Sequence, residues 1–398
     1  MARILVHALA ATAGGGANYL RNFLARVGAC GATHEWLVLA PAELEGVAET
    51  PHVRILRGGA GRGAVRRVYY DQIRLRQVIR EEEIELILAT GNFGMLRPPV
   101  PQVLLNRNAL YFSREHLWEL RRRGEFRELL NTMMRRRLAL ASIAGSACNV
   151  VPTHSFMQDV RASLPRLSGD RFETIPHGFD RAKFARPGAT LAPEIASKLR
   201  REPGLRRILM VSHYNYFRNF ETLLRAVAVL RERLKQPIEL VLTTKLGKGV
   251  KDHRYDTSEA ARLVEEAKLE NVVTMLGAVP HGELYPLYRS ADVVVCPSYA
   301  ESFGHPMVEA MASGRPIVAS DRGVQREMCG DAAVYFSVFD PQHLASRLEQ
   351  VLGDEALAKR LATNGERRAD DFSWEKHFDG LLETIGRTLV ASRPRVAA

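Results

Sequence analysis

The stretch YAESFGHPMVEAMASGRPIV, residues 299–318, decides the fold of this chain. An apolar run before it predicts a buried strand, and Pro306 suits the first turn of a helix. Two carboxylates, Glu301 and Glu309, flank the turn at Gly304. Main-chain N–H groups at a helix N-terminus favour the oxygens of a phosphate or a sugar. The pattern therefore predicts a ligand site in a loop that leaves a strand.

The length and composition of the chain are those of a two-domain globular protein. Its 398 residues exceed what one hydrophobic core usually serves, and 46% of them are apolar and 25% charged. No run reaches the roughly 20 apolar residues that a membrane-spanning helix needs. The N-terminal run MARILVHALA is short and is soon followed by glycines, so it predicts a buried strand in place of a signal peptide. Together these features predict a cytoplasmic protein.

The four cysteines lie far apart, with neither CxxC pairing nor the spacing of a zinc site. Three of them fall in apolar runs, which is typical of inert thiols and indicates a reducing compartment. The four are Cys30, Cys148, Cys296 and Cys329.

Short β-branched runs alternate with helical periodicity along the chain, which predicts parallel sheets covered by helices. The first series of expected strands lies at 4–9, 35–40, 52–57, 84–90, 102–106, 148–153 and 172–178. The second series lies at 207–212, 238–244, 271–277, 291–298, 315–320 and 333–336. Residues 184–204 between them have the composition of a linker. We predict an α/β protein with two Rossmann-like, parallel-sheet domains at 1–185 and 186–370, followed by a helical segment at 371–398, with ligands bound beyond the carboxyl ends of the strands.

The net charge of +11 is concentrated in the first domain, where residues 1–185 hold 26 Lys and Arg against 17 Asp and Glu. Two arginine triplets, 121–123 and 135–137, lie fourteen residues apart, which predicts one basic helical face over 121–137. Two interpretations stay open: a face for anionic lipid headgroups or a phosphate-bearing acceptor, and a solvated helix in an arginine-rich protein. No nucleic-acid-binding motif accompanies the charge, so no nucleic-acid partner is expected.

The two glutamates of the opening stretch have a chemical use. We expect Glu309 in the first turn of the helix, where its carboxylate can accept both hydrogen bonds of a vicinal diol such as a ribose. We expect Glu301, in the loop before the helix, to reach the same ligand from the other side. The alternative is that both carboxylates only stabilise the start of the helix, each by about 0.3–1 kcal/mol.

The segment PSYAESFGHPMVEAMASGRPIVAS, residues 297–320, resembles the signature of the retaining glycosyltransferases of family 4, in which two glutamates are separated by seven residues. The resemblance extends over nearly the whole chain. It implies a GT-B fold, with an acceptor domain followed by a nucleotide-sugar domain. It also implies that Glu309 holds the ribose of the donor and that Glu301 lies by the donor sugar and diphosphate. The main chain expected to contact sugar hydroxyls is that of Phe303, Gly304, His305 and Pro306.

The segment MVSHYNYFRNFETLLRAVAVL, residues 210–230, is similar to the part of the family that binds the donor diphosphate through a Gly-Arg pair and a later Lys-Asn pair. Arg218 and Asn219 match the later pair, whereas Ser212 and His213 replace the earlier one. An arginine just before a helix N-terminus suits a diphosphate, because the guanidinium and the helix dipole act together.

Two further segments follow the family pattern. The main chain from Gly277 to Val279 is expected to frame the nucleotide base, and FSWE at 372–375 to begin a helix that packs back onto the first domain. The turn IPHGFD at 175–180 is similar to the end of the family's first domain, with His177 in place of the usual Asn.

The first domain offers donors for the ligand as well. The amides of Gly15 and Gly16, between a strand and a helix, are expected to approach the donor phosphates or the acceptor. A dinucleotide loop would need a third glycine where Tyr19 stands, which disfavours a nicotinamide enzyme. Asn106 and Asn108 occupy the stretch where many family members place a histidine against the donor sugar. Together with His177 they are the acceptor-side candidates.

The hypothesis is a retaining hexosyltransferase that uses a UDP- or GDP-sugar and a hydroxyl acceptor, a cell-surface glycan or a lipid-linked precursor. Glu301 and Arg218 are its candidate catalytic residues. The chain contains no D-x-D triplet and no histidine ligand cluster, so no metal or bound cofactor is expected. The alternatives are a catalytically inactive glycan- or lipid-binding protein of the same fold, and another GT-B enzyme such as a nucleotide-sugar epimerase or a phosphorylase.

Overall fold

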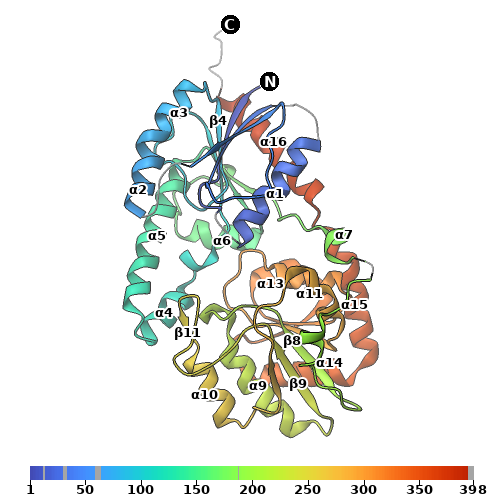
Figure 1. The fold of residues 1–398 in the computed structure, drawn as a ribbon. Helices are drawn as coiled ribbons and strands as arrows, with labels where there is room; N and C mark the ends of the chain where they lie inside the picture. Colours follow the sequence, from blue (N-terminus) through green and yellow to red (C-terminus); the bar gives the residue numbers. More distant parts are fainter. Residues whose placement is uncertain (12–13, 30–33, 59–63, 187, 393–398) are drawn as a thin grey trace. The chain divides into compact units, whose positions relative to one another are not determined.

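The computed structural model describes residues 1–11, 14–29, 34–58, 64–186 and 188–392. The chain forms two compact units, each built on one parallel sheet with helices around it (Figure 1). The first unit comprises Met1–Ser113, Gly124–Gly178 and Trp374–Ala398. The second comprises Arg114–Arg123 and Phe179–Ser373. The expected fold class is thereby confirmed.

The sheet of the first unit has seven parallel strands in the order β3-β2-β1-β4-β5-β6-β7. Its strands are β1 (Arg3–His7), β2 (Glu35–Ala40), β3 (Val53–Arg57), β4 (Leu86–Ala89), β5 (Gln102–Leu105), β6 (Cys148–Val151) and β7 (Phe172–Thr174). The helices of this unit are α1 (Gly14–Ala29), α2 (Ala64–Tyr69), the π-helical turn η1 (Tyr70–Arg74), α3 (Leu75–Glu81), the 3-10 turn η2 (Ala109–Tyr111), α5 (Phe126–Gly145), α6 (His154–Ala162), the 3-10 turn η3 (Gly169–Arg171) and α16 (Trp374–Ser392).

The last helix, α16, completes the core of the first unit. Trp374, Phe378, Leu381 and Ile385 lie one helical turn apart along α16 and pack in the same cluster as the apolar side chains of β1 and α1. In Figure 1 the red end of the chain accordingly lies beside the blue start. The helix expected to follow residue 372 is therefore present and packs on the first unit.

The sheet of the second unit has six parallel strands in the order β12-β9-β8-β13-β14-β15. These are β8 (Arg206–Met210), β9 (Ile238–Leu242), β12 (Val273–Met275), β13 (Val293–Cys296), β14 (Ile317–Ser320) and β15 (Ala333–Phe336), and a small antiparallel hairpin pairs β10 (Lys251–Asp252) with β11 (Tyr255–Asp256). The helices are α4 (Arg114–Arg122), α7 (Arg181–Phe184), α8 (Pro193–Ala196), η4 (Tyr216–Arg218), α9 (Phe220–Arg233), α10 (Ser258–Glu266), α11 (His281–Arg289), α12 (His305–Ala312), α13 (Gly323–Cys329), η5 (Gly330–Ala332), α14 (Pro341–Gly353) and α15 (Glu355–Ala369).

Every strand expected in the two series is present, and most differ from the predicted bounds by one to three residues at an end. The strands are buried on both faces because helices cover the sheets, which is why their sequences are continuous apolar runs. The β10–β11 hairpin was not predicted, since two-residue strands leave no periodic pattern. No helix in the described residues is long and apolar enough to cross a membrane.

The single basic helical face expected over 121–137 is wrong. Gly124 adopts φ = +70°, which ends α4 and turns the chain before α5 begins. The first arginine triplet therefore lies at the end of α4 and the second lies on α5, and these two segments belong to different units. Cys148 and Cys329 are buried and Cys296 is half-buried, whereas Cys30 lies outside the described residues.

A buried ion pair holds β8 against β9. The carboxylate of Glu239 is fully buried and accepts from Arg207 Nε at 2.7 Å and from the Thr274 hydroxyl at 2.6 Å. We expect Arg207→Ala to lower the free energy of unfolding of the second unit by about 3–5 kcal/mol, because Glu239 would remain as an unpaired buried charge. Urea titration followed by amide exchange in β8 and β9 measures this.

The adjacent Arg206 provides the control. It lies 3.5 Å from Asp292 and both side chains are about one-third exposed, so Arg206→Ala should cost about 0–1 kcal/mol. Equal shifts of the unfolding midpoint in the two variants would show that the Arg207 pair adds nothing beyond surface charge.

Candidate active site

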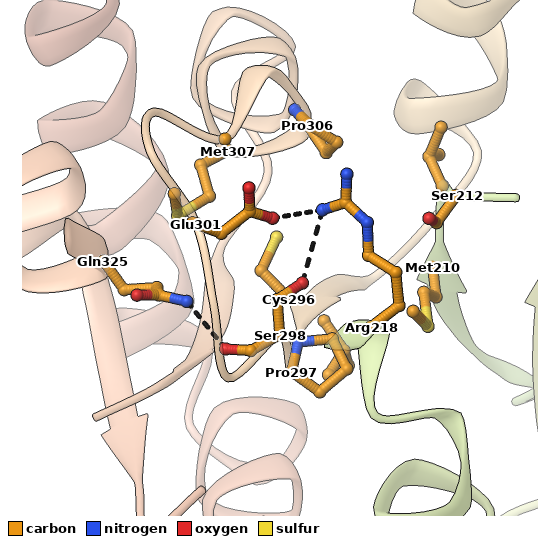
Figure 2. Close-up of a pocket in the computed structure, with 13 residues that line it drawn as sticks. Met210, Ser212, Arg218, Cys296, Pro297, Ser298, Glu301, Pro306, Met307 and Gln325 are labelled. Carbon is orange, nitrogen blue, oxygen red and sulfur yellow. Dashed lines mark hydrogen bonds and ion pairs between the residues drawn. The ribbon is translucent and has the colours of Figure 1, made fainter. Parts of the chain in front are cut away.

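The second unit has a pocket at the point where its strand order reverses. Strands β8 and β13 are neighbours, and the chain leaves them toward opposite halves of the sheet. In such folds ligands bind beyond the carboxyl ends of these two strands. The pocket is lined from there: by Met210, Val211 and Ser212 after β8, by Arg218, by Val295, Cys296, Pro297, Ser298 and Glu301 at and after β13, and by Gly304, Pro306, Met307 and Gln325 (Figure 2).

An ion pair between Arg218 and Glu301 crosses this pocket (Figure 2). The guanidinium also donates to the Ser298 hydroxyl at 3.3 Å. Among the described residues, its buried Nε atom has no hydrogen-bond partner. A buried donor without a partner is costly, and a phosphate oxygen would satisfy it. Arg218 and Glu301, which were each expected beside the donor diphosphate, therefore line one pocket.

The turn that carries Arg218 is stabilised by two asparagines. Asn215 caps η4, because its side chain accepts from the Phe217 amide at 3.4 Å. Asn219 ends the turn in the left-handed region, at φ = +59°, and begins α9. Its side-chain amide donates to the carbonyls of Pro297, at 3.1 Å, and Val338, at 2.6 Å. The Asn219 side-chain amide, expected to bind the donor, therefore braces the loop after β13.

The helix start that the opening stretch predicts is present, as the N-terminus of α12 with Pro306 in its first turn. Gly304 is the N-cap of α12 at φ = +84°, where a Cβ would come within 2.3 Å of the Met307 side chain. The amide of Met307 donates to the Gly304 carbonyl at 2.9 Å, because the first turn closes on itself. Phe303 is buried, and the centroid of its ring lies 5.0 Å from that of the exposed His305 ring.

Glu309 lies in the second turn of α12, so the expectation that it falls in the first turn is wrong. It is 8% exposed and accepts from the Tyr288 hydroxyl at 2.9 Å. Its other oxygen lies 3.9 Å from Nε2 of His281. Burial raises the pKa of Glu309 from 4.5 to about 7, against the opposing effects of the Tyr288 hydrogen bond and the Arg218 charge. The carboxylate is thus poised to be ionised by a ligand that donates hydrogen bonds to it.

The remaining donor candidates lie at the carboxyl ends of β8, β9 and β12. The Ser212 amide donates to the Thr243 hydroxyl at 2.8 Å, which ties the loop after β8 to the loop after β9. Gly277, two residues before Val279, adopts φ = +81°. The side chain of the exposed Lys245 packs over Gly277. This places a lysine against the main chain that was expected to frame a base.

The candidates of the first unit lie at the carboxyl ends of its own strands. Gly15 and Gly16 are in the first turn of α1. Asn106 is 1% exposed and its side chain donates to the Leu104 carbonyl at 3.3 Å, whereas the side chain of Asn108 caps η2 by accepting from the Leu110 amide. His177 is buried, and its ring contacts those of other aromatic residues, Tyr19 and His377. Both asparagines therefore use their side chains to shape the loop after β5.

Sequence reasoning missed three residues of the site. Gln325 and Ser298 line the pocket, where the Gln325 side chain donates to the Ser298 carbonyl at 2.8 Å. Tyr288 is the third, because its hydroxyl donates to the Glu309 carboxylate. Gln325 lies in the first turn of α13, the helix that follows β14, so its place shortly after a strand was the signal that could have found it. The described residues contain no group of three or more His, Cys, Asp or Glu side chains that could hold a metal ion.

Residues 192–368, which include the whole pocket, match the family described as glycosyl transferases group 1. This part of the second unit is thus similar to the group 1 glycosyltransferases. It is 32% identical over 222 residues to the D-inositol 3-phosphate glycosyltransferase of Nocardia farcinica, covering 55% of this chain and 48% of the relative. The chain thus spans about half the length of the curated relatives it matches.

Solved structures extend the likeness to the whole fold. Sucrose-phosphate synthase from Thermosynechococcus elongatus superimposes with a TM-score of 0.72 at 20% identity, covering 99% of this chain and 100% of that one. Anabaena Alr3699/HepE in complex with UDP-glucose gives a TM-score of 0.67 at 18% identity, covering 97% of this chain and 100% of that one. At these identities the likeness establishes the GT-B fold.

The raised pKa of Glu309 predicts a pH dependence of stability. The folded protein holds a proton on Glu309 that the unfolded chain releases above its ordinary pKa of 4.5, so stability is full below pH 4.5 and declines as the pH rises through about 7. We expect Glu309→Gln, which is neutral, to remove up to about 3 kcal/mol of this decline. Thermal midpoints of both proteins from about pH 5 to about pH 8 measure it. Parallel curves for the two proteins would contradict the assignment of the proton to Glu309.

Proposed function

We propose that the protein transfers a hexose from a UDP- or GDP-sugar to a hydroxyl acceptor with retention of anomeric configuration. The observation that carries the proposal is Arg218, whose guanidinium lies at the strand reversal, at the N-terminus of α9, with a buried Nε that lacks a partner in the described residues. A diphosphate would receive charge-assisted hydrogen bonds there, together with the partial positive charge of the helix.

The same residues suit the departure of a nucleoside diphosphate. In the proposed step the acceptor oxygen forms a bond to the anomeric carbon while the bond from that carbon to the diphosphate oxygen breaks. The acceptor proton passes to the departing phosphate on the same face. The chain positions the reactants, and Arg218 stabilises the negative charge that develops on the leaving oxygen. In the structure Glu301 is paired with Arg218. When the diphosphate binds the Arg218 guanidinium in place of Glu301, the Glu301 carboxylate would face the donor sugar.

Glu309 is assigned to the ribose of the donor. Its buried carboxylate, held by Tyr288 one helical turn behind His305, can accept from both hydroxyls of a vicinal diol. UDP-glucose is the first donor to test, since the Anabaena protein of the same fold is described in complex with it. A phosphate-bearing acceptor has support from the name of the Nocardia relative, a D-inositol 3-phosphate glycosyltransferase.

Binding of nucleoside diphosphates tests the assignment of Arg218. We expect UDP or GDP to raise the thermal midpoint of the wild-type protein in EDTA as well as in magnesium. Arg218→Ala should weaken the affinity about tenfold or more, because it removes charge-assisted hydrogen bonds to the diphosphate. Arg225→Ala is the matched control: Arg225 is an exposed arginine on α9, and its loss should leave the affinity within about twofold.

Absence of any nucleoside diphosphate effect on the wild-type protein would refute the nucleotide-sugar site and favour an inactive glycan-binding protein of the same fold. Conversion of UDP-glucose to another UDP-hexose without an acceptor would instead support an epimerase.

We further propose that α5 places the protein on an anionic membrane surface, which suits a lipid-linked acceptor. Phe126, Leu130, Met133 and Met134 are between 43% and 65% exposed and, with Arg137, recur at helical spacing on one face. Arg127, Arg135 and Arg137 are exposed and form no ion pair with any residue that the structure describes. Each arginine near an anionic surface contributes about 1 kcal/mol.

Vesicle binding tests this membrane face. We expect the protein to pellet with phosphatidylcholine vesicles only when they also contain phosphatidylglycerol, and the double variant Leu130→Glu, Met134→Glu to lose at least about tenfold in binding, since it removes apolar area and adds negative charge. Val390→Glu, at an isolated apolar side chain on α16 that is 71% exposed, should bind like the wild type. Equal loss in both variants would point to net charge alone.

A further inference from the structure

Helix α4 comes from the first half of the sequence but belongs to the second unit. It packs against η4, the turn that carries Arg218. Residues on either side of it, Ser113 and Gly124, belong to the first unit. Glu115 near its start pairs with Arg322 at 2.9 Å, and Arg123 follows its last residue. Both ends of α4 are therefore fastened to the second unit by charge.

The side chain of Arg123 is 9% exposed and bonds three carboxylates. Its Nε lies 2.5 Å from Glu119, its Nη1 lies 2.8 Å from Glu259, and its Nη2 lies 2.9 Å from Glu221. Burial disfavours the charged guanidinium, yet the nearby carboxylates outweigh it and raise the pKa of Arg123 above its ordinary value. Arg123 therefore carries its charge throughout the accessible pH range.

Two contacts of Arg123 bracket Arg218 in the sequence. The guanidinium lies over the ring of Tyr216, 4.1 Å from its centroid, and Tyr216 begins η4. It also bonds Glu221, which lies in the first turn of α9. The Tyr214 hydroxyl donates to the same Glu221 oxygen at 2.6 Å. One buried cation thus binds the chain both before and after Arg218.

We propose that Arg123 is a positioning residue for the donor diphosphate, which sets the conformation of residues 214–221 so that the Arg218 guanidinium points into the pocket. The inference rests on the proposed function for its ligand. A planar guanidinium can stack on a ring and fork to carboxylates at the same time, which an ammonium group cannot do. Neither a lysine nor a solvated arginine would hold Tyr216 and Glu221 together.

The neighbouring Arg122 supplies a matched control. It also pairs with Glu119 and Glu259, at 2.7 Å and 3.3 Å, but its side chain is 41% exposed. Among the interactions of the described residues, its bonds reach neither Glu221 nor Tyr216, and its ring contact is to Trp118. Arg122→Ala therefore removes a charge from the same cluster without releasing the Arg218 turn.

The experiment compares Arg123→Ala, Arg123→Lys and Arg122→Ala in the full chain by UDP and GDP titration, thermal midpoint and amide hydrogen exchange. We expect Arg123→Ala to weaken diphosphate affinity at least about tenfold and to speed exchange in 214–221 while β8 and β9 stay protected. Arg123→Lys should recover most of the thermal midpoint but less of the affinity. Arg122→Ala should change the affinity by less than about twofold.

Equal affinity losses in Arg123→Ala and Arg122→Ala, or unchanged exchange in 214–221, would overturn the inference. If Arg123→Ala fails to fold, Glu221→Gln breaks the same bond from the other side and should weaken diphosphate binding with little change of shape. Wild-type protein that binds no diphosphate would refute the proposed function instead, and the exchange measurement would still report whether Arg123 orders the turn.

Discussion

In the second unit the strand order reverses between β8 and β13, and the loops that leave these two strands must diverge. In such sheets ligands bind beyond the carboxyl ends of the two strands at the reversal, and the pocket lies there. Three of the residues assigned to the donor site lie at this reversal. Ser212 leaves β8, Glu301 leaves β13, and Arg218 reaches across from η4 to pair with Glu301.

Three largely buried arginine side chains of the second unit have distinct structural tasks. Arg207 joins β8 to β9 through the fully buried Glu239. Arg123 joins α4 to the start of α9 through Glu221. Arg218 combines, in the pocket, a carboxylate partner with a buried donor atom that no described residue satisfies. Paired buried charges stabilise a conformation, whereas an incompletely bonded one at an opening is suited to a ligand.

The strand pattern and the loop–helix junction at residues 299–318 could be predicted because they depend on local chemistry: buried parallel strands are continuous apolar runs, and a glycine followed by a proline sets a helix start. The family resemblance placed Arg218 and Glu301 at one donor site, but their ion pair was not predicted. The bonding of Asn219 and of the Met307 amide could not be predicted, since it depends on which carbonyls the folded loops bring within reach. The prediction of one basic helical face over 121–137 was wrong because Gly124, at φ = +70°, ends α4 between the two arginine triplets.

By itself, the sequence determined that this chain folds as two parallel-sheet α/β units and that residues 299–318 open a helix beside two carboxylates. Apolar periodicity and turn chemistry are properties of neighbouring residues, so they can be recognised in the sequence alone. Only the tertiary structure decided that Glu309 is buried against Tyr288, with a pKa raised to about 7. It also decided that α4 packs in the second unit, where Arg123 at its end contacts Tyr216 and Glu221. Those outcomes depend on desolvation and on contacts between residues some 20 to 100 positions apart, which folding alone brings together.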